Sequence, residues 1–264
     1  MKTFISILLI CLTLVPTTHV VAQDCGKSSR MLIPSFISSQ FSSVYQRVFI
    51  DPLKIATHCQ TELTVSRTLA KQLSQIKTAE YGSVMVPAVY APYAKQFGYE
   101  PLLFGGDFNA ILITQKNSTI KRVSDLKGKR ILLHDELHYT SVIWRQWQQK
   151  AKLKSDQVEI LYGDTLDGVI WQLHNNEADA AITASVFIEV MSPTVDAEFS
   201  IIKTMMIDQA AVILVHKDVP TNIKQNIKMS LMGVEDFNWS EQPSKLTADA
   251  VLDEKIRQIL QAAP

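Results

Sequence analysis

Residues 123–144, "VSDLKGKRILLHDELHYTSVIW", contain the local pattern that decides the fold. A polar turn with Gly128 leads into a short apolar run, and a cluster of Asp, Glu and His residues follows it. From Tyr139 onward, apolar residues recur at helical spacing. A buried strand that feeds a helix is the building unit of α/β proteins, so the stretch predicts a strand over 130–135 and a helix over 139–151.

The rest of the chain repeats this alternation of strand and helix. Residues 81–104 are typical of a buried strand, a proline-bearing loop, a short helix and another strand. Other strands are expected over 30–36, 61–66, 110–116, 158–163, 179–185, 199–207 and 210–217, and helices over 38–55, 67–80, 165–178, 221–232 and 249–263. Helix-length connections between strands indicate βαβ units, so we expect an α/β fold with mainly parallel sheets.

Two apolar extended segments, at 105–113 and 205–211, each stand where one α/β unit is complete. We therefore expect two α/β lobes joined by two crossover strands. The expected limits are 23–108 with 207–264 for lobe 1, and 109–206 for lobe 2. A cleft between the lobes would lie beyond the carboxyl ends of the strands, where α/β sheets bind their ligands.

The first 22 residues have the pattern of a cleaved secretory signal peptide. Lys2 precedes an apolar run over 4–15, and Val20 and Ala22 stand at the positions that a signal peptidase reads. The run is too short to span a bilayer permanently. We therefore expect residues 1–22 to be removed and the mature protein to be soluble and periplasmic.

Removal of the signal peptide would leave two cysteines, Cys25 and Cys59. They precede the first two expected strands, and they would be in an oxidising compartment. Pairing across neighbouring strand starts is therefore predicted, and a pair of unlinked thiols is the alternative.

Charge and motifs exclude several classes of protein. The 26 Lys and Arg residues balance 26 Asp and Glu residues, which argues against nucleic acid as a partner. The sequence has no nucleophile elbow, phosphate loop or Cys–His arrangement. We therefore predict no enzymatic activity and no cofactor.

Several segments resemble type II periplasmic solute-binding proteins. "VSDLKGKRILLHD" before Thr140 and Ser141 resembles the opening of the second lobe in the phosphate, phosphite and phosphonate branch of ABC-transporter binding components. Residues 81–107 are similar to the first-lobe ligand loop and crossover of that branch, and 158–187 to its strand, helix and strand pattern. The resemblance implies a two-lobed fold, a small polar ligand and an ABC permease as partner.

The chain departs from that branch at the predicted ligand corner. Phosphonate binders usually carry Ser-Thr-Ser-Gly there, whereas only Thr140 and Ser141 match and Val142 replaces the glycine. Asp135 and Glu136 beside them would repel a dianion. An oxyanion held by the two hydroxyls and a zwitterionic or neutral ligand therefore both remain open.

The candidate ligand-binding residues follow expected strand ends or lie at the first crossover. They are Ser35, Phe36, Pro87, Ala88, Tyr90, Asn109, Tyr139, Thr140, Ser141, Asp164 and Ser185. Ordinary roles stay open for several of them. Thr140, Ser141 and Asp164 are also typical helix caps, Tyr90 is equally suited to packing, and Asn109 to a hinge.

The segment "HDELH" at 134–138 invites comparison with a metalloprotease helix. Such a site needs H-E-x-x-H on one helix, but Asp135 replaces the glutamate and the segment begins at a strand end. We therefore predict no metal site, and interpret His134 and His138 as a cleft-rim or surface pair.

Together these patterns predict an exported monomer that binds a small polar ligand in an interlobe cleft for an ABC transporter. A periplasmic module that reports to a membrane kinase or cyclase is the first alternative. A hydrolase that uses Asp135, Glu136 and the histidines is the second.

Overall fold

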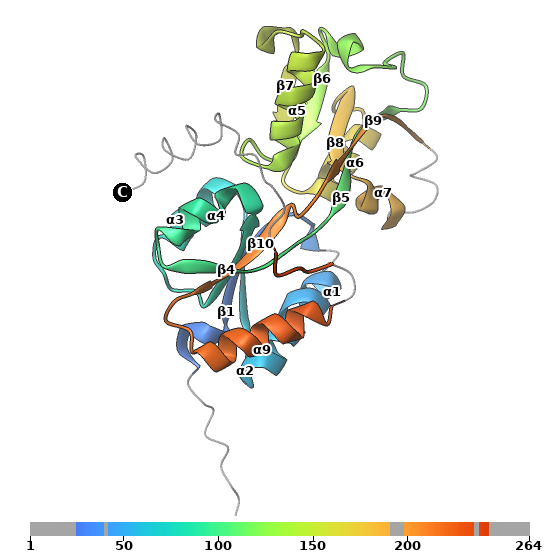
Figure 1. The fold of residues 1–264 in the computed structure, drawn as a ribbon. Coiled ribbons are helices and arrows are strands. Elements are labelled where there is room, and N and C mark those ends of the chain that lie inside the picture. Colours follow the sequence, from blue (N-terminus) through green and yellow to red (C-terminus); the bar gives the residue numbers. More distant parts are fainter. Residues whose placement is uncertain (1–24, 40–41, 191–197, 235–237, 243–264) are drawn as a thin grey trace, which may run out of the picture.

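The computed structural model describes residues 25–39, 42–190, 198–234 and 238–242. The predicted signal peptide over 1–22 and the predicted C-terminal helix over 249–263 lie outside these residues. Figure 1 shows that the described chain forms two bodies joined by extended strands.

The first sheet has five strands in the order β2-β1-β3-β10-β4. They are β1 (Arg30–Pro34), β2 (Glu62–Ser66), β3 (Ser83–Pro87), β4 (Tyr99–Gly105) and β10 (Ala211–His216). β1 pairs parallel with β2 and β3, whereas β10 pairs antiparallel with β3 and β4. This sheet and the helices on it are called lobe 1 below.

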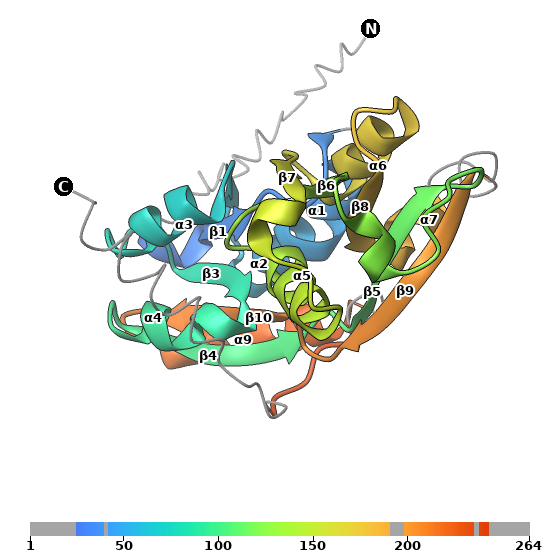
Figure 2. The same ribbon diagram turned by 90° about the horizontal axis from the view of Figure 1, so that it is seen from above.

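The second sheet repeats the design, in the order β7-β6-β8-β5-β9. Its strands are β5 (Phe108–Gln115), β6 (Arg130–Leu133), β7 (Glu159–Tyr162), β8 (Ala180–Ala184) and β9 (Phe199–Ile207). β6 pairs parallel with β7 and β8, and β5 pairs antiparallel with β8 and β9. β5 and β9 run side by side in Figure 2. This sheet and its helices are called lobe 2.

The two-lobed α/β fold is confirmed, and its sheets are mixed. In each sheet four strands run in one direction, and one strand, β10 in lobe 1 and β5 in lobe 2, runs in the opposite direction. The cause is the crossover: β4 leads directly into β5 and β9 into β10, with no helix between them to restore the strand direction.

Helices cover both faces of each sheet. On lobe 1, α1 (Ser42–Tyr45), a π-helical turn (Gln46–Ile50), α2 (Asp51–Thr57) and α9 (Thr221–Met232) pack on one face, and α3 (Leu69–Ile76) and α4 (Ala91–Lys95) on the other. On lobe 2, α5 (Tyr139–Lys150) packs on one face, and α6 (Leu166–His174) and α7 (Ser185–Val190) on the other. Short 3-10 turns span Gly26–Ser29, Ala88–Tyr90, Val123–Leu126 and Ser155–Gln157.

Double coverage explains why the central strands are continuously apolar. In β1, Leu32 enters the cluster beneath α3, whereas Met31 and Ile33 enter the cluster beneath α2 and α9. Successive side chains of a strand point to opposite faces, so a strand buried on both faces needs apolar residues at every position.

The predicted disulfide between Cys25 and Cys59 is present, with Cα atoms 6.4 Å apart. It joins the chain just before β1 to the chain just before β2, and these two strands are parallel neighbours. Their starts therefore lie at the same edge of the sheet, as the sequence indicated.

Helix α7 differs from the sequence expectations, and α6 has an exposed aromatic side chain. α7 was not predicted, because it begins directly at the end of β8. Trp171 on α6 has the apolar neighbours of a core residue but is exposed, since α6 turns Val169, Ile170 and Leu173 toward the sheet. Among the described residues, no helix has the length and apolar character needed to cross a bilayer.

Candidate ligand-binding site

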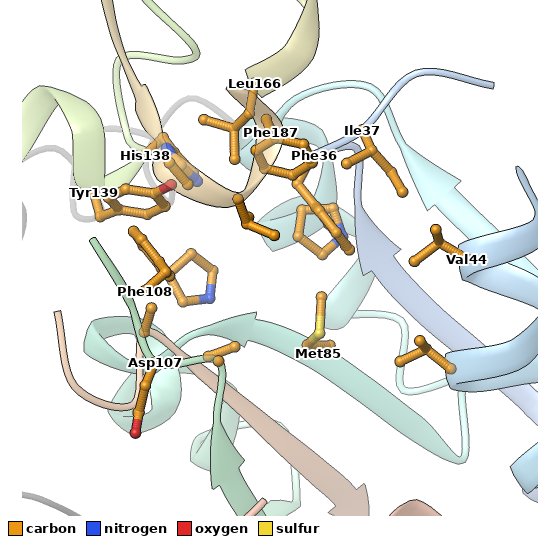
Figure 3. Close-up of a pocket in the computed structure, with 18 of the residues that line it drawn as sticks. Phe36, Ile37, Val44, Met85, Asp107, Phe108, His138, Tyr139, Leu166 and Phe187 are labelled. Atoms are coloured by element: carbon orange, nitrogen blue, oxygen red, sulfur yellow. The ribbon is translucent and has the colours of Figure 1, made fainter. Parts of the chain in front are cut away.

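A pocket of about 550 Å³ lies where the two lobes meet (Figure 3). Lobe 1 lines it with Pro34, Phe36, Ile37, Val44, Arg47, Val48, Met85, Val86 and Pro87. Lobe 2 contributes His138, Tyr139, Leu166, Ala184, Ser185, Val186, Phe187 and Glu189. Gly106, Asp107, Phe108, Asn109, Ala210 and Ala211, near the crossovers, and Asn238 complete the lining. The pocket therefore lies at the carboxyl ends of β1, β3 and β8, where open α/β sheets bind ligands.

The apolar wall of lobe 1 is formed in part by α1 and the π-helical turn that follows it. Val44 and Val48 are four residues apart, so they share one helical face, and that face is turned to the pocket. Phe36 is held from behind by edge-on contacts with Tyr45 and Phe49, whose ring centroids lie 5.4 and 6.5 Å away. Figure 3 shows Phe36, Ile37, Val44 and Met85 on this side of the cavity.

The charged lining residues lie at the rim. Arg47, Asp107 and Glu189 are all exposed. The Asp107 carboxylate accepts a hydrogen bond of 2.6 Å from the backbone N–H of Gln209, and Figure 3 shows it directed away from the centre of the pocket. The interior therefore has no charged side chain among the described lining residues.

The corner after β6 is a closed hydrogen-bond network. The Thr140 hydroxyl accepts from the backbone N–H of His134 at 3.4 Å and lies 3.2 Å from His138 Nδ1. The Ser141 hydroxyl donates to the backbone oxygen of Asp135 at 2.6 Å. His138 itself caps α5, because its Nδ1 accepts from the Thr140 N–H at 3.4 Å. The hydroxyls of Thr140 and Ser141 are thus bonded within the corner itself.

Both histidines of this corner are buried, with ring centroids 4.6 Å apart. Burial lowers the pKa of His138 well below its usual value, and the neighbouring His134 lowers it further. Burial also lowers the pKa of His134, and the Asp135 carboxylate opposes that shift. The pair is therefore neutral at pH 7. Since Nδ1 of His138 is an acceptor, its ring proton is on Nε2.

Tyr139 stands beside this pair with its ring on the pocket. Its ring centroid lies 3.7 Å from that of His138 and 4.5 Å from that of Phe108. Its hydroxyl oxygen is buried and has no hydrogen-bond partner within the described part of the chain. Burial raises the pKa of this hydroxyl well above its ordinary value, so it remains a protonated donor.

Two aspartates of lobe 2 accept hydrogen bonds from the backbone of lobe 1. The Ser38 N–H donates to the Asp167 carboxylate at 2.9 Å, and Asp167 is fully buried at the start of α6. The Leu69 N–H, at the start of α3, donates to the Asp135 carboxylate at 3.3 Å. Carboxylates of one lobe thus meet free N–H groups at helix starts or in loops of the other.

Two further hydrogen bonds cross between the lobes through backbone oxygens. The Leu166 N–H donates to the Phe36 oxygen at 3.0 Å. The Tyr90 hydroxyl donates to the Leu137 oxygen at 2.6 Å. The lobes are therefore in direct contact, and the pocket is enclosed between them.

Phe187 is the apolar counterpart of these hydrogen bonds. It belongs to α7 of lobe 2, yet it packs against the apolar clusters of both lobes. It also lines the pocket, above Met85 in the view of Figure 3. Phe187 therefore contributes both to the pocket wall and to the contact between the lobes.

Five of the predicted ligand-binding residues line the pocket: Phe36, Pro87, Asn109, Tyr139 and Ser185. They come from both lobes and from the first crossover. The structure thus brings together residues that are up to 149 positions apart in the sequence, as the predicted cleft requires.

The other six predicted residues are not in the pocket lining: Ser35, Ala88, Tyr90, Thr140, Ser141 and Asp164. The hydroxyls of Thr140 and Ser141 bond within their own corner, and that of Tyr90 bonds across the lobes. The backbone N–H groups of Ser35 and Ala88 donate to Ser66 and Ala210. Asp164 is exposed, and Thr165 is the residue that caps α6, by accepting from the Gly168 N–H at 3.0 Å.

Sequence reasoning missed most of the apolar lining, including Val44, Val48, Met85, Leu166 and Phe187. In the sequence these residues have the apolar character of any core position. The spacing of Val44 and Val48 was the one available signal, and it equally fits a helix that packs on its own sheet.

The sequence suggested that the histidines form a cleft-rim or surface pair, and the structure differs from the surface alternative. Both are buried, and His138 lines the pocket. In the described part of the chain, no group of three or more His, Cys, Asp and Glu side chains is placed to hold a metal ion.

The two lobes, the double crossover and the enclosed pocket define the class of a two-lobed ligand-binding protein. A family model described as "ABC transporter, phosphonate, periplasmic substrate-binding protein" matches residues 32–257. The chain therefore belongs to this family of transporter components, which confirms the resemblance found in the sequence. No match was found among the curated proteins.

Solved structures agree on the fold. A binding protein component of an ABC phosphonate transporter from Pseudomonas aeruginosa is similar with a TM-score of 0.66 and 14% identity, over 90% of this chain and 80% of that one. PhnD1 from Prochlorococcus marinus, in complex with methylphosphonate, gives 0.64 and 10%, over 89% and 91%. A protein from Xanthomonas citri bound to a chloride ion gives 0.60 and 16%, over 89% and 98%.

Proposed function

We propose that this chain captures a small ligand in the pocket between its lobes and delivers it to an ABC permease. The observation that carries the proposal is the composition of the pocket wall, to which both lobes and both crossovers contribute. A ligand that touches both lobes favours the closed arrangement, because its contacts are complete only when the lobes meet.

The proposed ligand contacts are Phe36, Pro87, Asn109, Tyr139 and Ser185, which line the pocket. The proposed division of the chain is 23–108 with 207–264 for lobe 1 and 109–206 for lobe 2. The crossovers between Gly105 and Phe108 and between Ile207 and Ala211 support these limits. The crossovers would then act as the hinge when the lobes open.

A thermal-shift panel tests ligand capture. The panel contains phosphate, methylphosphonate, sulfonates, amino acids, thiamine-like compounds and neutral aromatic compounds. A ligand at 100 times its Kd adds about 2.7 kcal/mol to the free energy of unfolding, which raises the Tm by roughly 5–10 °C for a chain of this size. No shift with any compound, together with no bound compound in native mass spectrometry, would contradict the proposal.

A matched pair of variants shows whether the pocket is responsible. Ser185→Trp fills the pocket from its lobe 2 wall and should abolish the shift. Ser155→Trp, in an exposed 3-10 turn outside the pocket, adds the same side chain and should keep it. Equal shifts in both variants would place the ligand elsewhere.

The partner and the state of the protein are part of the same proposal. The chain would be exported after removal of residues 1–22 and would act as a monomer without catalysing a reaction. Cross-linking in cells should join it to a permease, and the ligand should be recovered unchanged by mass spectrometry. Cross-linking to a membrane kinase or cyclase would instead identify a sensor module, and light scattering checks the monomer.

A further inference from the structure

We propose that the pocket binds an uncharged, mainly apolar molecule that presents a hydrogen-bond acceptor to the hydroxyl of Tyr139. The inference names the ligand class of the proposed function, and it rests on ligand capture between the lobes. It departs from the phosphonate in the description of the family.

The first reason is the apolar interior. The buried lining residues include Pro34, Ile37, Val48, Met85 and Leu166. They enclose the cavity from both lobes, and Phe36 and Phe108 add aromatic surface between them. Such a surface favours apolar area on the ligand over a hydrated anion.

The second reason is the absence of a cationic interior. Among the described lining residues the charged ones are Arg47, Asp107 and Glu189, and all three are exposed at the rim. A dianion moved into an apolar cavity loses its hydration, and only paired charges or several donors can compensate for that loss. The rim carries two carboxylates and only one guanidinium, so its net charge does not favour an anion either.

The third reason is that the hydroxyls in the corner after β6 already make hydrogen bonds within that corner. The hydroxyls of Thr140 and Ser141 bond to His134 and Asp135, as described above. The rings of His134 and His138 are neutral because burial lowers the pKa of both, so they add no positive charge. The groups that would hold an oxyanion are therefore used inside the protein.

The fourth reason is Tyr139. Its ring lines the pocket, and its buried hydroxyl lacks a partner within the described residues. A buried donor without a partner is unfavourable, and since its oxygen has almost no exposed surface here, an acceptor on the ligand would satisfy it once the ring turns the hydroxyl toward the cavity. Because burial raises the pKa of this hydroxyl, it stays protonated and suits a neutral acceptor such as a carbonyl oxygen.

Three probes separate the contributions of an aromatic ring and of the polar head group to binding. They are acetophenone, phenylphosphonate and methylphosphonate. Acetophenone carries an aromatic ring and a neutral acceptor, phenylphosphonate the same ring with an anionic head group, and methylphosphonate the head group without the ring. Saturation-transfer NMR and calorimetry would measure each affinity. We expect acetophenone to bind at least tenfold more tightly than methylphosphonate, with phenylphosphonate weaker than acetophenone.

A matched pair of tyrosine variants tests the donor. Tyr139→Phe should weaken acetophenone binding by about fivefold, as expected for the loss of one neutral hydrogen bond. Tyr81→Phe removes a hydroxyl from lobe 1 that accepts from Gln75 and does not line the pocket, so it should leave the affinity unchanged. Equal affinities of both variants for acetophenone would overturn the assignment of Tyr139 as donor.

The outcomes also separate this inference from the proposed function. Tighter binding of methylphosphonate than of acetophenone, lost in Ser185→Trp, would overturn the ligand class and keep ligand capture. Binding of neither probe, with no hit in the wider panel, would overturn both. Tight acetophenone binding that survives Ser185→Trp would place the apolar site outside the pocket and overturn the inference.

Discussion

The two walls of the pocket differ in chemistry. Lobe 1 presents Phe36, Val44, Val48 and Met85, with Arg47 at the edge, so its contribution is apolar area. Lobe 2 adds the polar side chains of His138, Tyr139 and Ser185 to its own apolar residues, such as Leu166. The difference indicates a division of roles, in which one lobe attracts the ligand and the other orients it. Changes to each wall should therefore have different consequences.

The largest effect is expected from Phe187→Ala, which removes from the lobe 2 wall a side chain that also packs into lobe 1. Loss of this partly buried phenyl group should cost about 2 kcal/mol, or roughly thirtyfold in acetophenone affinity. Small-angle scattering should show a larger radius of gyration for the ligand-free variant.

Trp171→Ala is the control for that change, because it also removes a large aromatic side chain from lobe 2. Trp171 is exposed on α6 and does not line the pocket. It should leave both the affinity and the radius of gyration unchanged. A loss of affinity as large as that of Phe187→Ala would show that the effect does not come from the contact between the lobes.

The next effect concerns pH, to which only the lobe 2 wall should respond. Burial lowers the pKa of His138 in the folded protein, whereas an unfolded chain titrates near 6.5. Below about pH 6.5 the unfolded state therefore binds more protons, and stability falls as the pH falls. The slope contributed by one such histidine is about 1.4 kcal/mol per pH unit, and His138→Asn, which keeps a capping acceptor, should remove it.

The pH experiment compares two histidine variants. Burial, with a contribution from Lys27, also lowers the pKa of His216, but His216 belongs to lobe 1 and does not line the pocket. His216→Asn should therefore change the pH dependence of unfolding and leave that of acetophenone binding as in the wild type. His138→Asn should reduce the pH dependence of both between pH 7.5 and 5.5, while His134 and His216 keep the rest of the slope of unfolding. An unchanged pH profile of binding in His138→Asn would show that the two walls do not differ in their response to pH.

The fold was predictable because its determinants are local. β5, β6 and β10 are apolar at nearly every buried position, and this pattern identifies strands covered on both faces without any knowledge of their neighbours. The crossovers were visible for the same reason, since extended apolar segments follow complete α/β units. The reversed direction of β5 and β10 was not a local feature, because each of them enters its sheet from the other lobe.

The site was predictable only in part, because side-chain direction depends on the helix register. Pro87 and Ser185 lie at strand ends, so their place at the sheet edge fixes them near the pocket. Thr140 and Ser141 lie at a helix start, where the capping role of His138 turns their hydroxyls inward. Val44 and Val48 reach the pocket from α1 and the π-helical turn after it, and no feature of the sequence signals that turn.

A smaller effect is expected from the hydrogen bond that Tyr90 makes across the lobes. Tyr90→Phe removes the donor to the Leu137 oxygen, and Tyr93→Phe removes an equivalent donor to Leu73, which lies within lobe 1. Both variants should lower the free energy of unfolding by about 1 kcal/mol. Only Tyr90→Phe should also weaken acetophenone binding, by about fivefold in calorimetry. Equal affinities of the two variants would mean that this bond does not contribute to closure.

The smallest effect is expected from Arg47→Gln, which tests the one cation in the described lobe 1 wall. Arg47 is exposed at the rim, where water and salt screen its charge. Acetophenone affinity should therefore change by less than twofold, the same as in Lys54→Gln, an exposed cation on α2 outside the pocket. Phenylphosphonate should lose a little more, and that loss should vanish at 1 M salt, because the screening length is then about 3 Å. A fivefold loss of acetophenone affinity in Arg47→Gln alone would mean that the lobe 1 wall also orients the ligand, and the proposed division between an attracting and an orienting wall would be wrong.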